Sequence, residues 1–249
     1  MSEAEHQAIV RQEFERAAEG FAKRTRGRFD HLNVLGFSRV QPGATVLEVG
    51  AGTGNFISIF EHVAGSVIAA DLTPGMLRVA REQHPALALL VADGARLPLG
   101  DRTIDLATSA HAVHHIPDPV PVFRELARVT ADGGRVMVVD IAAPEDPGAA
   151  RRMNEVMLVR DPSHATAYTP GALCALIERA GLRVVDQAVV DRIGHVSNWM
   201  SPGEYPPERI EAVHRYVAEH WRAIGMGMEP DGDDFTYVDH RTMILAEPG

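Results

Sequence analysis

The chain has 249 residues, 45% hydrophobic and 23% charged, which is enough for one large α/β domain with a sizeable core. Its net charge of −10 argues against a nucleic-acid or anionic-membrane surface, and no stretch approaches the roughly 18 apolar residues of a membrane span. A single cysteine, Cys174, excludes an internal disulfide, and the charged start lacks an apolar signal core, so we expect a cytoplasmic protein.

The N-terminal segment is predicted to be helical. Residues 4–21 place Val10, Phe14, Phe21 and other apolar side chains at helical spacing, and a second apolar stretch follows. We expect residues 1–40 to form a helical cap and residues 41–249 to form the main domain.

From Gly43 onward, short apolar runs alternate with helix-like segments. The runs are ATVLEV, SVIAAD, LALLVA, TIDLATS and GRVMVVDI. Nearly continuous apolar runs suit strands covered on both faces, so the pattern predicts βαβ units around a mainly parallel sheet. Thr73-Pro74, Asp118-Pro119 and Thr169-Pro170 each place a capping oxygen before a proline, which indicates three helix starts.

The last third is less regular. LRVVDQAVVDRI and FTYVDHRTMILAE are predicted strands, and PPERIEAVHRYVAEHWRAI is a predicted helix. The segment 142–168 is too long for a plain connection and contains a further helical pattern, ARRMNEVMLVR. We expect insertions near 142–168 and 194–228 to act as substrate lids.

The block TVLEVGAGTGNF is the most informative part of the sequence. A strand ends in Glu48, Gly50, Gly52 and Gly54 follow at alternate positions, and a helix is expected to begin near Asn55. Glycines permit a tight turn and close approach of a ligand, and a helix start presents free N–H groups. Such a turn alone is weak support for a binding site.

Polar residues at the ends of later strands strengthen the prediction. Asp71 follows the glycine loop by about 20 positions, where an acidic residue can bind ribose hydroxyls. Asp93 ends the next strand and so lies at the same edge of a parallel sheet. The combination predicts a ligand that carries a ribose.

Three features distinguish between ribose-bearing ligands. The glycines occupy positions 1, 3 and 5, not positions 1, 3 and 6 as in the dinucleotide fingerprint. Lys23 is the only lysine, which excludes a Walker motif. Glu48 would disfavour a pyrophosphate and favour a cationic ligand. S-adenosylmethionine (SAM) has an ammonium, a sulfonium and a ribose.

On these residues the sequence resembles the class I SAM-dependent methyltransferases, and more narrowly their UbiE-like branch of ubiquinone and menaquinone C-methyltransferases. The matching blocks are VLEVGAGTGNF, AADLTPGML, VADGARLPLGDRTIDLATSAHAVHHIPDP and FRELARVTADGGRVMVVDI. The resemblance implies a Rossmann-like, mostly parallel seven-stranded sheet of order 3-2-1-4-5-7-6, with helices on both faces. Strand 7 would be antiparallel and lie between the strands that end near Asp140 and Asp191.

The resemblance also implies the residues that contact the cofactor. Glycines of the first loop would wrap the methionine and ribose parts, Asp71 would take the ribose hydroxyls, and Asp93 would receive the adenine amino group. The full predicted set is Glu48, Gly50, Ala51, Gly52, Gly54, Asp71, Leu72, Met76, Ala92, Asp93, Gly94, Ala95 and Ser109.

The resemblance does not identify a catalytic residue, and the candidates are histidines. His111, His114 and His115 have helical spacing, but no Cys, Asp or Glu nearby has ligand spacing, so no metal is expected. His114 or His115 is a candidate base, although such a pair is commonly structural in the family. His164 lies in the expected lid, where a neutral imidazole takes a proton from an acceptor or simply holds the loop.

The sequence therefore predicts a SAM-dependent methyltransferase that acts on carbon, oxygen or nitrogen of a small molecule, mainly by proximity and orientation, and releases S-adenosylhomocysteine (SAH). A SAM-binding enzyme that does not methylate, such as a cyclase, is the alternative. An NAD(P)-dependent oxidoreductase is disfavoured by the glycine spacing. The sequence does not identify the acceptor, the methylated atom or the oligomeric state.

Overall fold

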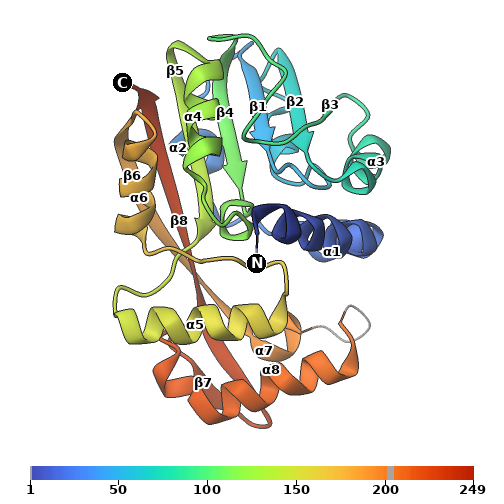
Figure 1. The fold of residues 1–249 in the computed structure, drawn as a ribbon, viewed down its shortest axis with the longest axis vertical. Helices are drawn as coiled ribbons and strands as arrows, with labels where there is room; N and C mark the ends of the chain where they lie inside the picture. The colour runs from blue at the N-terminus through green and yellow to red at the C-terminus, as the bar shows by residue number, and fades with distance from the viewer. Residues whose placement is uncertain (1, 201–204) are drawn as a thin grey trace.

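A mostly parallel β-sheet forms the centre of the computed structural model, which describes residues 2–200 and 205–249 (Figure 1). Its strands are β1 (Thr45–Val49), β2 (Ser66–Asp71), β3 (Ala88–Val91), β4 (Ile104–Ala110), β5 (Thr130–Ile141), β6 (Leu182–His195), β7 (Glu229–Asp231) and β8 (Asp234–Pro248). The order is β3-β2-β1-β4-β5-β8-β6, and β8 is antiparallel to both of its neighbours. The predicted order is confirmed, with β8 as the inserted strand. The short β7, which pairs with β8, is an addition that the sequence did not predict.

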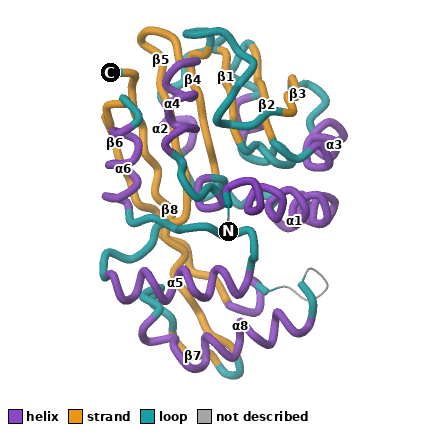
Figure 2. The backbone as a smooth tube through the Cα atoms, in the orientation of Figure 1, coloured by secondary structure: helices purple, strands orange, loops and turns teal. Residues whose placement is uncertain are grey.

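The helices surround this sheet (Figure 2). They are α1 (Glu3–Arg24), α2 (Val34–Ser38), α3 (Pro74–Gln83), α4 (Val120–Val129), α5 (Pro147–Arg160), α6 (Pro170–Arg179), α7 (Val196–Trp199) and α8 (Pro207–His220), with 3₁₀ helices η1 (Ile57–Phe60), η2 (Val113–His115) and η3 (Trp221–Ala223). Thr169 caps α6 by accepting from the N–H of Ala172, as predicted. The Thr73 side chain makes no such bond, and Glu15 of α1 instead accepts from the N–H of Gly75 at 3.0 Å.

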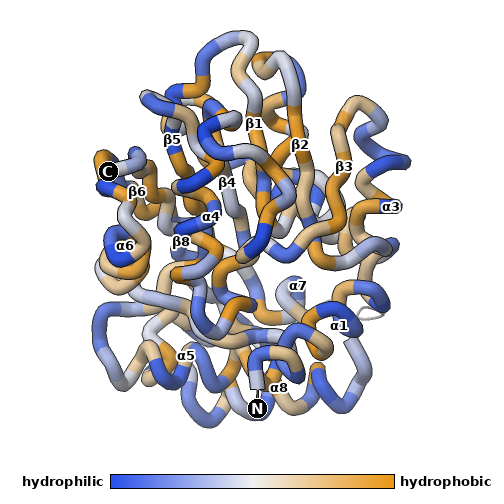
Figure 3. The backbone as a smooth tube through the Cα atoms, turned by 45° about the horizontal axis from the view of Figure 1, so that its top comes forward, coloured by the Kyte–Doolittle hydropathy of each residue, from blue (hydrophilic) through white to orange (hydrophobic). Residues whose placement is uncertain are grey.

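Two apolar cores lie on opposite faces of the sheet, as alternation along a buried strand requires. In β1, Val46 packs into one core with Phe56 and Phe60, whereas Leu47 packs into the other with Phe123 of α4. Figure 3 shows the apolar residues gathered along the strands. Because both faces are covered, the carboxyl ends of the strands remain as the place where a ligand can reach the sheet.

The predicted helix after the glycine loop is wrong. The segment folds only into the four-residue 3₁₀ helix η1. Gly54 turns the chain at a φ of +83°, and the side chains of Phe56, Ile57 and Phe60 are buried in the core just beyond it. Because these three side chains are all buried within one short segment, the chain forms a tight turn here and not a regular helix. The glycine loop is therefore not followed by the N-terminus of an α-helix.

A third apolar core lies beyond the carboxyl ends of the central strands. The extended ends of β6 and β8 run past the rest of the sheet and are covered by α5, α7 and α8 (Figure 1). The segments 142–168 and 194–228 build this part of the molecule, apart from residues 201–204, which lie outside the described residues. It faces the carboxyl edge of the sheet, with α1 between the two parts (Figure 1).

Candidate functional site

A cavity lies at the carboxyl ends of β1, β2, β3 and β4, and α1 covers it. Most of the predicted cofactor residues line it: Glu48, Gly50, Ala51, Gly52, Asp71, Leu72, Met76, Ala92, Asp93, Gly94 and Ala95. We refer to it as the first cavity. The topology brings these residues together because parallel neighbouring strands end at one edge.

Asp71 is fixed in the wall of the first cavity by backbone hydrogen bonds. Its Oδ2 accepts from the N–H of Gly52, and its Oδ1 accepts from the N–H of Thr73, both at 2.8 Å. Burial raises the pKa of Asp71, and these two hydrogen bonds oppose that effect. Each oxygen keeps a further lone pair, so a held carboxylate in this position can accept from two hydroxyl groups.

Glu48 lies deeper in the same wall, with only 1% of its surface exposed. Burial raises the pKa of Glu48 well above its ordinary value, and the nearby Asp71 carboxylate adds to this effect. Its Oε2 has no hydrogen-bond partner among the described residues. An unsatisfied buried carboxyl oxygen is costly, so this atom favours a ligand that brings a cation or a hydrogen-bond donor.

Two glycines in the wall of the first cavity lie where the surrounding side chains leave no room for a Cβ. A Cβ on Gly50 would lie 2.4 Å from the Cβ of Ala112, and Gly50 has a φ of +74°. A Cβ on Gly94 would lie 2.5 Å from the Val49 side chain. A larger residue at either place would displace the opposite wall or strain the backbone.

Two predicted cofactor residues do not line the first cavity. Gly54 faces Leu87 and His84 and serves the turn. Ser109 is fully buried, and its Oγ has no partner among the described residues. Ala110, His111 and Ala112, which follow Ser109, line the cavity in its place.

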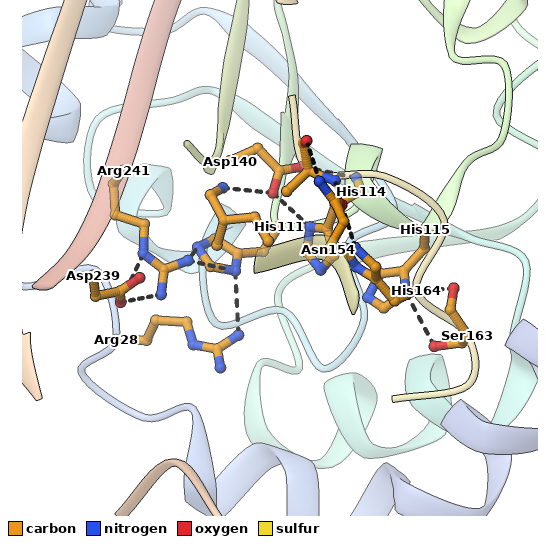
Figure 4. A network of polar contacts seen from close by, with 12 residues as sticks. Arg28, His111, His114, His115, Asp140, Asn154, Ser163, His164, Asp239 and Arg241 are labelled. Carbon is orange, nitrogen blue, oxygen red and sulfur yellow. Dashed lines mark hydrogen bonds and ion pairs between the residues drawn. The ribbon is translucent and has the colours of Figure 1, made fainter. Parts of the chain in front are cut away.

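A second cavity adjoins the first and extends towards α5 and the long arm of β6 and β8. The two cavities share five lining residues: Phe14, Phe21, Arg28, His111 and His115. Figure 4 shows the histidines of this region and their polar partners. A group that passes from a ligand in the first cavity to one in the second must cross this junction.

His115 is the predicted catalytic candidate that reaches the junction. Its Nδ1 lies 3.0 Å from the carbonyl oxygen of Ser163, and a carbonyl only accepts, so Nδ1 carries the proton. The lone pair is therefore on Nε2. Burial, followed by the neighbouring His114, lowers the pKa of His115 to about 4. The ring is neutral near pH 7 and can accept a proton at Nε2.

His114 belongs to a buried pair with Asp140. Its Nδ1 lies 2.5 Å from Asp140 Oδ1, and its carbonyl oxygen accepts from the N–H groups of Ala165 and Thr166. Burial alone would raise the pKa of Asp140, but His114 and the N–H of Ile141 hold that pKa below its ordinary value. His114 lines the second cavity and also ties the lid segment to the end of β5.

His164 does not reach either of the two cavities within the described residues. Its Nε2 bonds to Asn154 Oδ1 at 2.8 Å, and only 4% of its surface is exposed. Burial, followed by the two neighbouring histidines, lowers its pKa to about 3. This geometry favours the loop-holding interpretation of His164 over the catalytic one.

The sequence did not predict the surroundings of His111, which contacts two arginines at the junction of the two cavities. This residue has a φ of +54°, rare for a side chain with a Cβ, and lies between Arg28 and Arg241 (Figure 4). Burial and the two arginines lower the pKa of His111 well below its ordinary value. No local sequence signal marks it, because both arginines come from distant parts of the chain.

Helix α1 also supplies more of the site than a simple cap. Its side chains line the first cavity at His6, Val10, Phe14 and Phe21, which share one helix face. The apolar stripe of the sequence contains three of these residues, but the stripe does not show which surface it covers.

Residues 2–200 and 205–249 were also compared with the requirements of a metal site and of a membrane-spanning helix. There, no group of three or more His, Cys, Asp or Glu side chains lies close enough together to hold a metal ion. Within the same residues, no helix has the length and apolar character to cross a bilayer.

Comparison with known proteins places this geometry in context. Residues 47–138 match a family model described as a methyltransferase domain. The chain is 36% identical over 104 residues to the demethylmenaquinone methyltransferase of Streptomyces griseus, covering 42% of this chain and 45% of that protein. With a second such enzyme, from Corynebacterium urealyticum, the coverage of the relative is 54%, so the chain spans about half the length of these curated relatives.

A longer match extends over both parts of the molecule. The uncharacterized methyltransferase YcgJ of Bacillus subtilis is 30% identical over 173 residues, 68% of each chain. The crystal structure of YcgJ superimposes with a TM-score of 0.79 and 22% identity, covering 87% of this chain and 97% of that one. The structural match shows that the two share a fold.

Proposed function

Because the chain belongs to the class I SAM-dependent methyltransferases, we propose that it transfers a methyl group from SAM to carbon, oxygen or nitrogen of a small molecule. The observation that carries the proposal is the first cavity, in which Asp71, Glu48 and the glycine loop meet at the carboxyl edge of the sheet. The Rossmann-like fold and the family assignment support the same reaction class.

The residues of the first cavity fit SAM. Asp71 offers lone pairs for ribose hydroxyls, the unpartnered Oε2 of Glu48 suits the ammonium, and Gly50 lets the loop turn against Ala112 where a Cβ would clash. In the proposed complex Asp93 accepts from the adenine amino group; Ala92, Gly94 and Ala95 line the cavity beside it. When bound, SAM supplies an electrophilic methyl group.

The chain's own contribution to the reaction is mainly to orient the acceptor and exclude water. Holding the reactants close together in the right orientation lowers the activation barrier by roughly 7–11 kcal/mol. Helix α1 covers the first cavity, and we propose that residues 1–40 act as a cap and that 142–168 and 194–228 act as lids over the acceptor. His115 Nε2 takes a proton where the acceptor carries an O–H or N–H group.

The remaining assignments follow the same physical arguments. The single cysteine suits a reducing compartment, which supports a cytoplasmic location. The acidic balance argues against nucleic acid as the substrate.

Thermal and urea unfolding with SAM, SAH or NADH tests the cofactor assignment. SAH at about 100 times its dissociation constant should stabilise the protein by roughly 2.7 kcal/mol, and NADH should not. Asp71→Ala should remove the SAH effect, because the variant lacks both carboxylate oxygens in the wall. Asp132→Ala, an exposed aspartate at the start of β5, is the matched control and should respond like the unmodified protein.

A panel of small-molecule acceptors then separates methyl transfer from other uses of SAM. Release of SAH that depends on an acceptor supports a methyltransferase. An acceptor that is converted without SAH release would identify the cyclase-like alternative, and stabilisation by NADH in place of SAH would reject the proposal.

A further inference from the structure

The second cavity is strongly cationic although the chain as a whole is acidic. Its lining contains seven arginines but only three carboxylates, Glu13, Asp161 and Asp239, in a chain of net charge −10. Converging like charges repel one another, so an anionic ligand would stabilise the arginines that exceed the carboxylates here. Composition alone therefore does not explain this lining.

The arginines come from separate elements that converge on one space. Arg28 follows α1, Arg160 ends α5, Arg192 lies on β6 and Arg241 lies on β8. Burial and the Asp239 carboxylate raise the pKa of Tyr237, whereas Arg160, Arg241 and Arg28 each act to lower it, so three positive charges and one negative charge act at one phenol. The same Arg241 and Arg28 flank His111 at the junction with the first cavity.

The three carboxylates of the lining neutralise only part of this charge, because they are outnumbered by the seven arginines. Glu13 pairs with Arg16 at 2.8 Å and with Arg209 at 3.5 Å. Asp239 pairs with Arg241. Asp161 accepts from the N–H and the Oγ of Ser163.

Arg160 is the arginine best placed for a ligand. Its guanidinium carbon lies 5.0 Å from the ring centroid of Trp199 and 5.5 Å from that of Tyr205. Its charge helps to lower the pKa of the neighbouring Asp161, which burial alone would raise. Its buried Nε has no hydrogen-bond partner in the described part of the chain. The rings of Trp199 and Tyr205 hold the planar guanidinium of Arg160 in place before a ligand arrives. A guanidinium held in this way suits recognition of a carboxylate or phosphate.

Apolar side chains line the cavity beside these arginines. Met153, Met157 and Met226 belong to the third core and also face the second cavity. Flexible thioether side chains adapt to an apolar body of irregular shape. The cavity thus offers a cationic region and an apolar wall within one space.

We propose that the second cavity binds an amphipathic acceptor through its carboxylate or phosphate group, held by Arg160 with Arg28 and Arg241, while its apolar body lies against the methionines. This inference rests on the proposed function, since it places the acceptor next to the junction at His111 and His115. It assigns an anionic acceptor class to the enzyme.

Three naphthalene probes with a common apolar body test the proposal: 2-naphthoate, 2-naphthyl phosphate and the neutral 2-naphthamide. Their binding is measured by calorimetry on the full chain, with and without saturating SAH, and SAH binding is measured in the same preparations. At least one of the two anions should bind about tenfold more tightly than the amide. The naphthoate and phosphate arms show which anionic group is preferred.

Variants of Arg160 locate the binding. Arg160→Gln should weaken the preferred anion about tenfold and leave the amide and SAH unchanged, while Arg160→Lys, which keeps the charge but not the planar guanidinium, should recover only part of the anion affinity. Arg124→Gln, an exposed arginine of α4 outside both cavities, is the control and should bind like the unmodified protein. Unfolding midpoints show that each variant is folded.

The outcomes distinguish a failure of the anionic-acceptor proposal from a failure of the proposed function. Equal binding of anions and amide, or normal anion binding by Arg160→Gln, would overturn the anionic-acceptor proposal while SAH binding kept the proposed function. Absence of SAH binding would overturn the proposed function, and the acceptor assignment with it, whatever the probes did.

Discussion

His115 combines the features of a proton acceptor at the junction of the two cavities. The carbonyl oxygen of Ser163 fixes the tautomer, and the pKa of about 4 keeps the ring neutral at physiological pH. His115→Gln should lower kcat by about 100-fold for an acceptor with an ionisable O–H or N–H, and leave SAH affinity unchanged. SAH release at pH 5 to 8 measures the effect, and kcat of the unmodified protein should stay level over this range, because the His115 ring is protonated only near pH 4.

The exposed His62 provides the control for this variant, and His62→Gln should leave kcat unchanged. Unaltered turnover in His115→Gln would mean that orientation alone drives transfer, and that the imidazole only packs against Phe14, whose ring centroid is 4.9 Å away.

His164 should affect the free energy of unfolding of the protein and not its kcat. Its pKa of about 3 in the folded protein is below its ordinary value of 6.5, so the unfolded chain takes up a proton first as the pH falls. The stability that the neutral ring contributes is complete above pH 6.5 and is lost between pH 6.5 and 3. At pH 4.5 the loss should reach about 2 kcal/mol, and His164→Gln should lack it. Urea unfolding at pH 7.5, 5.5 and 4.5 measures the difference, and parallel pH profiles would contradict this account.

Between elements, Glu15 joins the covering helix α1 to the start of α3. It accepts from the N–H of Gly75 at 3.0 Å and from Arg78 at 3.2 Å, and so provides the cap that Thr73 does not. Glu15→Ala should cost about 1 kcal/mol of stability. It should also weaken SAH binding, because α1 covers the first cavity.

The neighbouring Glu19, exposed on the same helix, supplies the matched control. Urea unfolding and SAH titration of both variants measure the difference. Equal behaviour of Glu15→Ala and Glu19→Ala would show that α1 is held by its apolar face alone.

At the level of the whole molecule, the two proposed ligands are bound by different parts of the chain, SAM in the first cavity and the acceptor in the second. The first is built from the sheet and α1, whereas α5 and the long β6–β8 arm contribute only to the second. SAH should therefore slow hydrogen exchange in α1 and in the loop after β1, and leave exchange in α8 unchanged. Exchange mass spectrometry with and without SAH tests this, and uniform protection of α8 and α1 would contradict the division.

Local patterns in the sequence determined the sheet and most of the first cavity. Apolar runs identify the strands, and residues placed just after parallel strands must meet at one edge, so Asp71 and Asp93 could be placed from sequence spacing. Family resemblance supplied the position of β8. The helix after Gly54 was mispredicted because side-chain packing of Phe56 and Phe60 outweighed local propensity.

Only the tertiary structure decided which side chains meet across the cavities. Arg28 and Arg241 lie 83 and 130 positions from His111 along the chain, on opposite sides of it, and no local period relates them. In the folded chain His164 lies outside both cavities, whereas His115 lies at their junction. Both are histidines near predicted polar loops, so the sequence did not distinguish them. The physical reason is that periodicity reports which face of an element is buried, whereas contacts between distant elements depend on how those faces pack.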